Sequence, residues 1–82
     1  MYTLNLRLSN IEKEFKADSV EDVLDLMAKG LDVTQIKTRA WIKISDGKNS
    51  AERHYFIPQM RRLINNPITR KITAKVFNGG LK

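Results

Sequence analysis

Polar and apolar residues alternate with a period of two over long stretches of this chain, and this pattern limits its fold more than any other feature. Residues 2–8 place three leucines on one side and mainly polar side chains on the other, and residues 11–17 alternate in a similar way. Successive side chains of a β-strand point to opposite faces, so each stretch predicts a strand with one buried face. Ser9-Asn10 suits a tight turn between them, and we expect a β-hairpin.

The next stretch, residues 19–29, has helical spacing. Its apolar residues recur at positions i, i+3, i+4 and i+7, namely Val20, Val23, Leu24 and Met27. Asp18 or Ser19 is a suitable N-cap, and Gly30 is a suitable residue to end the helix. We therefore expect an amphipathic helix with one face turned toward the core.

A second pair of strands and a short helix follow. Residues 35–45 alternate strictly, and one face of the expected strand consists of Ile36, Thr38, Ala40, Ile42 and Ile44. An Asp-Gly turn within residues 46–50 leads to a strand over residues 51–57. Pro58 suits the first turn of a helix, whose apolar face consists of Met60, Leu63 and Ile64. Asn66-Pro67 stops that helix.

The last segment, residues 68–77, fits two patterns. Ile68, Ile72 and Val76 lie at helical spacing, but residues 72–77 also alternate and are rich in β-branched side chains. We expect a strand here and a frayed tail over residues 77–82. The sequence thus predicts one α+β domain, an antiparallel sheet of four or five strands with two helices packed on one face, in the order ββαββα(β).

The composition excludes several classes of protein. A chain of 82 residues makes one domain with a modest core. It has no cysteine, which excludes disulfides and thiolate zinc sites. No apolar run approaches the ~20 residues of a membrane span, and the first residues lack the pattern of a signal peptide. We expect a protein of the bacterial or host cytoplasm.

Positive charge is concentrated in the second half of the chain. Residues 1–34 carry four cations and seven carboxylates, a net charge of −3, whereas residues 35–82 carry eleven cations and two carboxylates, a net charge of +9. A domain with one strongly basic part attracts anionic partners. Nucleic acid, either DNA or RNA, is the partner that this distribution favours.

The candidate binding site lies on the strand expected over residues 35–45. Four side chains project from the face opposite its isoleucines: Lys37, Arg39, Trp41 and Lys43. Lysine and arginine neutralise phosphates, and an indole stacks on bases, so this face predicts non-enzymatic nucleic-acid binding. Further candidates on neighbouring elements are Arg53, Tyr55, Arg61, Arg62, Arg70, Lys71 and Lys75.

Other interpretations stay open at this point. Trp41 also suits burial beneath a helix, or a hot spot for protein contact. The chain would then be a small protein-binding accessory or inhibitor module from a phage or other mobile element, with its acidic residues between positions 12 and 32 toward the partner. An edge strand such as Tyr2–Leu8 would also allow pairing across a homodimer.

The chain lacks a recognisable reactive motif. His54 is its one histidine, and its four glycines form no phosphate-binding loop. We therefore expect no catalytic residue, no bound metal and no cofactor. Cleavage of RNA by His54 through acid–base chemistry is a distant alternative.

Overall fold

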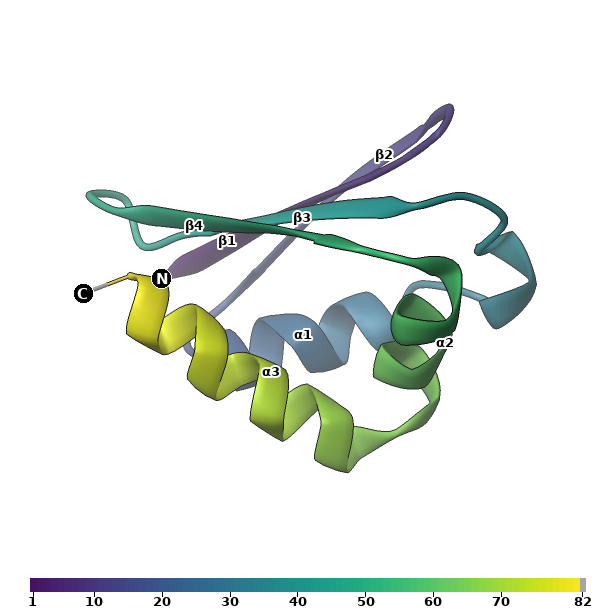
Figure 1. Cartoon of the computed structure of the whole chain (residues 1–82). Helices are drawn as coiled ribbons and strands as arrows, with labels where there is room; N and C mark the ends of the chain where they lie inside the picture. The colour runs from purple at the N-terminus through teal and green to yellow at the C-terminus, as the bar shows by residue number, and fades with distance from the viewer. Residues whose placement is uncertain (82) are drawn as a thin grey trace.

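The structure, a computed structural model, describes residues 1–81 and consists of one sheet with helices on one of its faces (Figure 1). Its elements are β1 (Tyr2–Leu8), β2 (Ile11–Ala17), α1 (Val20–Lys29), a single 3₁₀ turn η1 (Val33–Gln35), β3 (Ala40–Ser45), β4 (Ser50–Tyr55), α2 (Ile57–Asn65) and α3 (Pro67–Gly80). The predicted α+β class, the antiparallel sheet and the helices on one face are confirmed. Over residues 1–81 the sheet has four strands, and there are three α-helices where two were expected.

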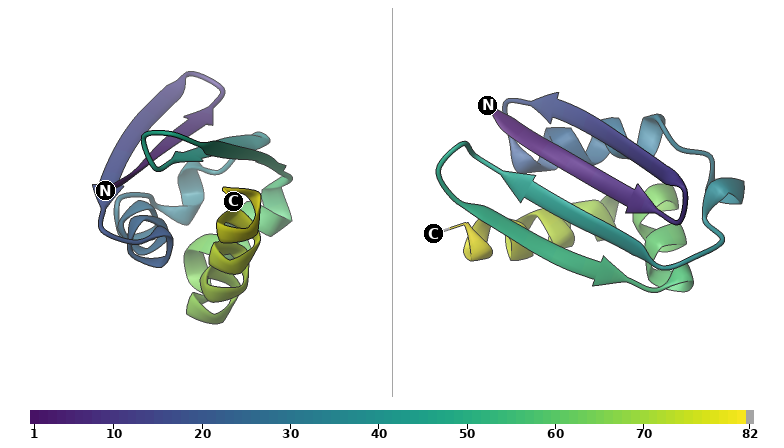
Figure 2. Two further views of the ribbon diagram at one scale, coloured as in Figure 1. Left: turned by 90° about the vertical axis from the view of Figure 1, so that its left-hand side faces the viewer. Right: turned by 90° about the horizontal axis from the view of Figure 1, so that it is seen from above.

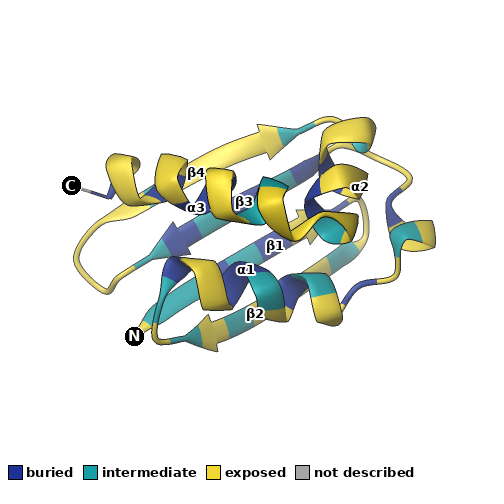
Figure 3. Ribbon diagram, turned by 90° about the horizontal axis from the view of Figure 1, so that it is seen from below, coloured by how far each residue is buried: buried dark blue, intermediate teal, exposed yellow. Residues whose placement is uncertain are grey.

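The strands lie in the order β2-β1-β3-β4, and all neighbours are antiparallel (Figure 2). β1 is therefore a central strand, and the expectation that Tyr2–Leu8 forms an edge open to a second chain is wrong. Both backbone edges of β1 are already paired, one with β2 and one with β3. Its three leucines lie opposite the apolar residues of β3, and all of these side chains are buried under the helices (Figure 3).

The two hairpins and the first helix agree with the local sequence signals. The Ser19 hydroxyl accepts a hydrogen bond from the backbone N–H of Asp22, as expected for an N-cap of α1. Gly30 ends the helix, but in a right-handed conformation. A Cβ there would lie 2.8 Å from the ring of Phe15, so this glycine is needed for close approach of α1 to β2.

The strand expected over residues 35–45 begins only at Ala40. β1 ends at Leu8, which lies opposite Ala40, and β4 ends at Tyr55, which also lies opposite Ala40. Residues 36–39 thus have no neighbouring strand with which to form a ladder. The chain instead enters β3 from η1, and the side chain of Ile36 is buried in the core.

The strand expected over residues 51–57 also ends earlier, at Tyr55, because helix α2 already begins at Ile57. Pro58 lies in the first turn of α2, and Met60 and Leu63 form its buried side, as predicted. The side chain of Gln59 accepts a hydrogen bond from the backbone N–H of Phe56 and so holds the strand-to-helix corner. Asn66 ends α2 and at the same time begins α3.

The segment expected to be a strand, residues 68–77, is part of helix α3. The side chain of Asn66 accepts hydrogen bonds from the N–H groups of Ile68 and Thr69, and Pro67 occupies the first turn, which together start a helix. The helix continues to Gly80, and both Phe77 and Leu81 are buried in the core. The expected tail over residues 77–82 is therefore wrong for residues 77–81, and residue 82 lies outside the described part.

Each outer strand carries a cation on the face that the helices cover. On β2 this residue is Lys13, whose Nζ donates to the carbonyl oxygen of Gly30 at 3.1 Å. On β4 it is Arg53, which lies opposite the buried Ile42. Within residues 1–81, none of the helices combines the length and apolar character that crossing a membrane requires.

Candidate nucleic-acid interface

Trp41 and Lys43 lie on the face of the sheet that no helix covers, called the open face below. The strand register arranges the open face in rows that run across the four strands. One row consists of Glu12, Arg7, Trp41 and His54, and the next consists of Glu14, Asn5, Lys43 and Glu52. The expectation that Trp41 projects away from the core is confirmed.

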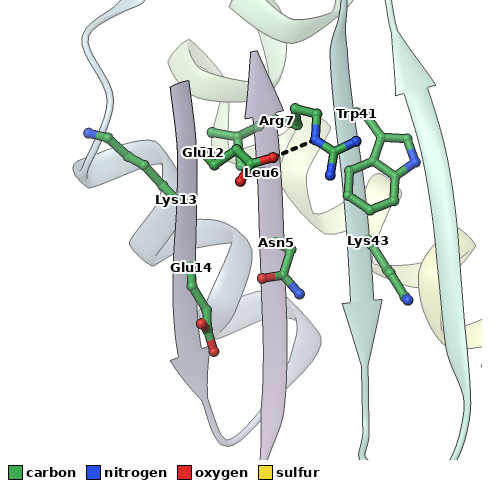
Figure 4. A pocket seen from close by; sticks show the side chains of 8 residues that line it. All are labelled: Asn5, Leu6, Arg7, Glu12, Lys13, Glu14, Trp41 and Lys43. Carbon is green, nitrogen blue, oxygen red and sulfur yellow. Dashed lines mark hydrogen bonds and ion pairs between the residues drawn. The ribbon is translucent and has the colours of Figure 1, made fainter. Parts of the chain in front are cut away.

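The indole of Trp41 is held by its neighbours on both adjacent strands, and Figure 4 shows the side on which Arg7 lies. The guanidinium of Arg7 lies 5.0 Å from the ring centroid and also bonds Glu12, with 2.8 Å between Nε and Oε1. On the other side, the indole Nε1–H donates to Oε2 of Glu52 at 2.9 Å. The ring, although partly exposed, thus already stacks with one cation and bonds one carboxylate.

The open face is mixed in charge rather than basic. It carries the three carboxylates of Glu12, Glu14 and Glu52 and the three cations of Arg7, Lys16 and Lys43. Asn5, Arg7, Trp41 and Lys43 line a shallow hollow of about 390 Å³ on this face, together with Glu12 and Glu14. Because the carboxylates of the open face equal its cations in number, this face alone lacks the net positive charge that attracts a polynucleotide.

Arg53 and Tyr55 do not extend the open face, contrary to the expected arrangement. They lie opposite Ile42 and Ala40, so they are on the face that the helices cover. The Tyr55 side chain is half-buried, and this burial raises the pKa of its phenol, although the charge of Arg53 acts in the opposite direction. His54, between them in the chain, is the β4 residue that lies beside Trp41.

Lys37 and Arg39 do not lie on a strand; they belong to the segment before β3, which contacts the start of α2 and residues 8–11. The guanidinium of Arg39 lies 5.6 Å from the ring centroid of Phe56, and the side chain of Phe56 is 59% exposed. Nη2 of Arg61 donates to the carbonyl oxygen of Ile36, next to Lys37, at 3.2 Å. We call this set, Lys37, Arg39, Phe56 and Arg61, the basic end.

Carboxylates flank the segments of the basic end but are absent within them: Asp32 directly precedes one segment and Glu52 the other. Residues 33–45 and 53–66, which build the basic end, contain no Asp or Glu. The adjoining hairpin turn, residues 8–11, lies against Lys37 and Thr38 and contains none either. Figure 1 shows the chain entering β3 and the start of α2 at this same end. The positive end of the α2 dipole adds to the cations there.

The remaining predicted cations have other surroundings. Arg62 is exposed on α2 and lines a small hollow with Tyr55 and Thr69. Arg70 is structural: its guanidinium bonds Asp25 of α1 and two carbonyl oxygens of α2. Lys71 and Lys75 lie on α3, along a hollow that they share with Asp18 and Glu21. The structure therefore distributes the eleven predicted residues over several surfaces.

Two residues of this region were missing from the prediction. Arg7 is on the polar side of the alternation in residues 2–8, but its place beside Trp41 follows from the pairing of β1 with β3, which joins distant segments. Phe56 was assigned to a strand, and its exposure results from the corner between β4 and α2. The acidic residues between positions 12 and 32 also separate, since Glu12 and Glu14 lie on the open face and Glu21 on α1.

Comparisons with protein-family profiles, with curated proteins and with solved structures gave no match to this chain. Among residues 1–81, no three His, Asp or Glu side chains lie close enough together to hold a metal ion. The basic end and the adjoining Arg7–Trp41 row are thus the candidate site, on geometry and charge alone.

Proposed function

We propose that the protein binds nucleic acid through its basic end, with Trp41 at the border of the contact surface. One observation carries the proposal: Arg39 lies on the exposed ring of Phe56, and Arg61 bonds the backbone next to Lys37, in segments that contain no carboxylate. Cations supply sequence-independent affinity for phosphates, and an aromatic ring with a stacked guanidinium offers flat surfaces to an unpaired base. A single-stranded region is therefore the favoured target.

The two arginines of the basic end can bind phosphate without first breaking an ion pair within the protein. Arg61 uses one of its N–H groups on the carbonyl oxygen of Ile36, and the other donors of a guanidinium stay available. Arg39 lies on the ring of Phe56 and has no ion pair with a carboxylate of residues 1–81, so a phosphate does not have to displace such a pair. This distinguishes the basic end from the open face, where Arg7 is bound to Glu12.

Fluorescence anisotropy with labelled single-stranded and duplex oligonucleotides tests the proposal. Binding is expected at low salt, with log K falling linearly with log salt concentration. Phe56→Ala should weaken single-strand binding by about 1–3 kcal/mol, and each lost cation should reduce the salt slope by about 0.7 on single strands.

A matched pair of lysine variants locates the contact. Lys37→Ala removes a charge from the basic end, whereas Lys48→Ala removes the same charge from the β3–β4 turn at the other end of the sheet. Only the first is expected to weaken binding. Equal effects of the two variants would place the contact elsewhere, and absence of any binding at low salt would reject the proposed function.

A further inference from the structure

Helix α3 has an exposed apolar stripe on its outer side. Ile68, Ile72 and Val76 follow one another at intervals of four residues and are 67%, 60% and 44% exposed. Side chains at this spacing lie along one line of a helix. The opposite side of α3, with Thr73, Ala74 and Phe77, is the side packed against the core.

The outer side of the helix layer carries cations on α3 and mainly carboxylates on α1. Lys71 and Lys75 are both exposed and directly precede the stripe residues Ile72 and Val76, and within the same chain they line a hollow together with Asp18 and Glu21. The neighbouring helix α1 presents the exposed carboxylates of Glu21 and Asp22 in its first turn, the exposed apolar side chain of Leu26, and one exposed cation, Lys29, in its last turn. Figure 3 shows α1 and α3 side by side over the same face of the sheet. The same molecule thus offers both halves of a complementary contact.

We propose that two copies of the chain associate through their helix layers, with α3 of each copy on α1 of the other. A two-fold axis parallel to the helices, between two layers that face one another, places each α3 opposite the other copy's α1. The lysines beside the stripe then meet Glu21 and Asp22 of the other copy, and the stripe covers Leu26. Both contacts form twice, because the interface is self-complementary.

Two other ways to cover the stripe, a different dimer arrangement and a lipid surface, agree less well with the charges. A two-fold axis across the helices would set α3 against α3 and gather Lys71 and Lys75 of both copies along one edge, where like charges repel. An anionic lipid surface would attract the lysines but repel Glu21, Asp22 and the partly exposed Asp25 of the adjacent helix. The contact of α3 with α1 is the arrangement that sets Lys71 and Lys75 of one copy opposite Glu21 and Asp22 of the other.

Sedimentation equilibrium of the full chain over a wide concentration range, at low and high salt, tests the association. A reversible dimer is expected. Ile72→Glu should raise its dissociation constant at least about tenfold, since a carboxylate would be buried in the interface. Phe56→Glu is the matched control, because Phe56 is equally exposed but lies at the basic end, and it should leave the dimer unchanged. Circular dichroism confirms that both variants fold.

Charge reversal separates the two dimer arrangements. In the proposed one, Lys71→Glu with Lys75→Glu weakens the dimer, and so does Glu21→Lys with Asp22→Lys. A chain that carries all four changes regains the dimer, because each α3 again meets an α1 of opposite charge. Under packing of α3 on α3, each pair of changes leaves the association as it was, and this result would overturn the arrangement.

Two further results would overturn the proposal as a whole. One is a wild-type chain that stays monomeric at every concentration. The other is a monomer that co-sediments with vesicles of anionic phospholipid and loses this property on Ile72→Glu. Neither result bears on the basic end, whose test is oligonucleotide binding, so failure of one proposal leaves the other intact.

Discussion

Nε of Arg70 on α3 lies 2.8 Å from Oδ1 of Asp25 on α1, and Nη1 of the same guanidinium donates to the carbonyl oxygens of Leu63 and Ile64 at the end of α2. One side chain, only 14% exposed, thus joins three helices and satisfies carbonyl groups that the last turn of α2 leaves without a helical partner.

Replacing Arg70 is expected to destabilise the fold through these carbonyl groups more than through the ion pair. Arg70→Met should lower the free energy of unfolding by about 2–3 kcal/mol, because hydrogen bonds to a charged group are lost and buried acceptors stay unpaired. Asp25→Asn should cost less than about 1 kcal/mol, since the side chain of Asp25 is 41% exposed. Urea denaturation measures both, and equal losses would contradict this division.

Two adjacent glycines of α3 should respond differently to alanine. A Cβ at Gly79 would meet nothing within 4 Å, so Gly79→Ala should raise the free energy of unfolding by about 0.5–1 kcal/mol through helix propensity. A Cβ at Gly80 would lie 3.0 Å from Cβ of Ala51 on β4. Gly80→Ala should therefore gain less or lose stability. Thermal unfolding of the two variants gives the comparison. An identical gain in stability would show that β4 shifts to accept the added Cβ without a cost in free energy.

Arg7 and Trp41 should be energetically coupled across the central strands. A double-mutant cycle with Arg7→Ala and Trp41→Ala is expected to give about 0.5–1 kcal/mol, the usual range for an exposed cation over an indole. The control cycle pairs Arg7 with Glu12, whose side chains are both largely exposed and should couple by less than about 0.5 kcal/mol. A coupling of Arg7 with Trp41 no larger than the control would refute the cation–π contact.

Asp46 should make the fold sensitive to acid. The backbone N–H of Asn49 and then that of Lys48 donate to its carboxylate, and these bonds lower the pKa of Asp46 below its ordinary value. Because the folded chain holds the ionised form more strongly, this contribution is complete above the unfolded pKa and is lost as the pH falls through the folded one.

The comparison of Asp46→Asn with the wild type measures that contribution. The asparagine can still accept both bonds but does not titrate, so its unfolding midpoint should fall less steeply between about pH 5 and pH 2. Asp32, whose pKa is also lowered, by a backbone hydrogen bond from Thr34, remains in both proteins and explains any residual slope. Parallel curves for the two proteins would disprove the role of Asp46.

Elements with strong local signals were predictable from the sequence. Alternation and the Ser9-Asn10 turn predicted the first hairpin, and the cap at Ser19 and the proline at position 58 predicted the starts of α1 and α2. In each case the residues that decide the conformation are neighbours in the chain, so the local pattern contains the information.

Features that depend on distant segments were not predictable in the same way. The alternation of residues 36–39 resembles a strand, but no other strand reaches that far, since β1 and β4 both end opposite Ala40. The isoleucines of α3 resemble a core face, yet they point to solvent, while the smaller Thr73 and Ala74 pack inside with Phe77. The candidate site differs from the predicted one for the same reason. Lys37 and Arg39 were expected on a strand face, but they lie beyond the end of the sheet.

The cations on the covered side of the outer strands, Lys13 and Arg53, have a consequence for concentrated solutions of this protein. A foreign strand that extended the sheet at either rim would have to enclose a charged group against the hydrocarbon interior, at a high desolvation cost. The rims thus discourage fibril-like growth, and we expect Lys13→Val and Arg53→Val to form aggregates at concentrations where the wild-type chain remains clear.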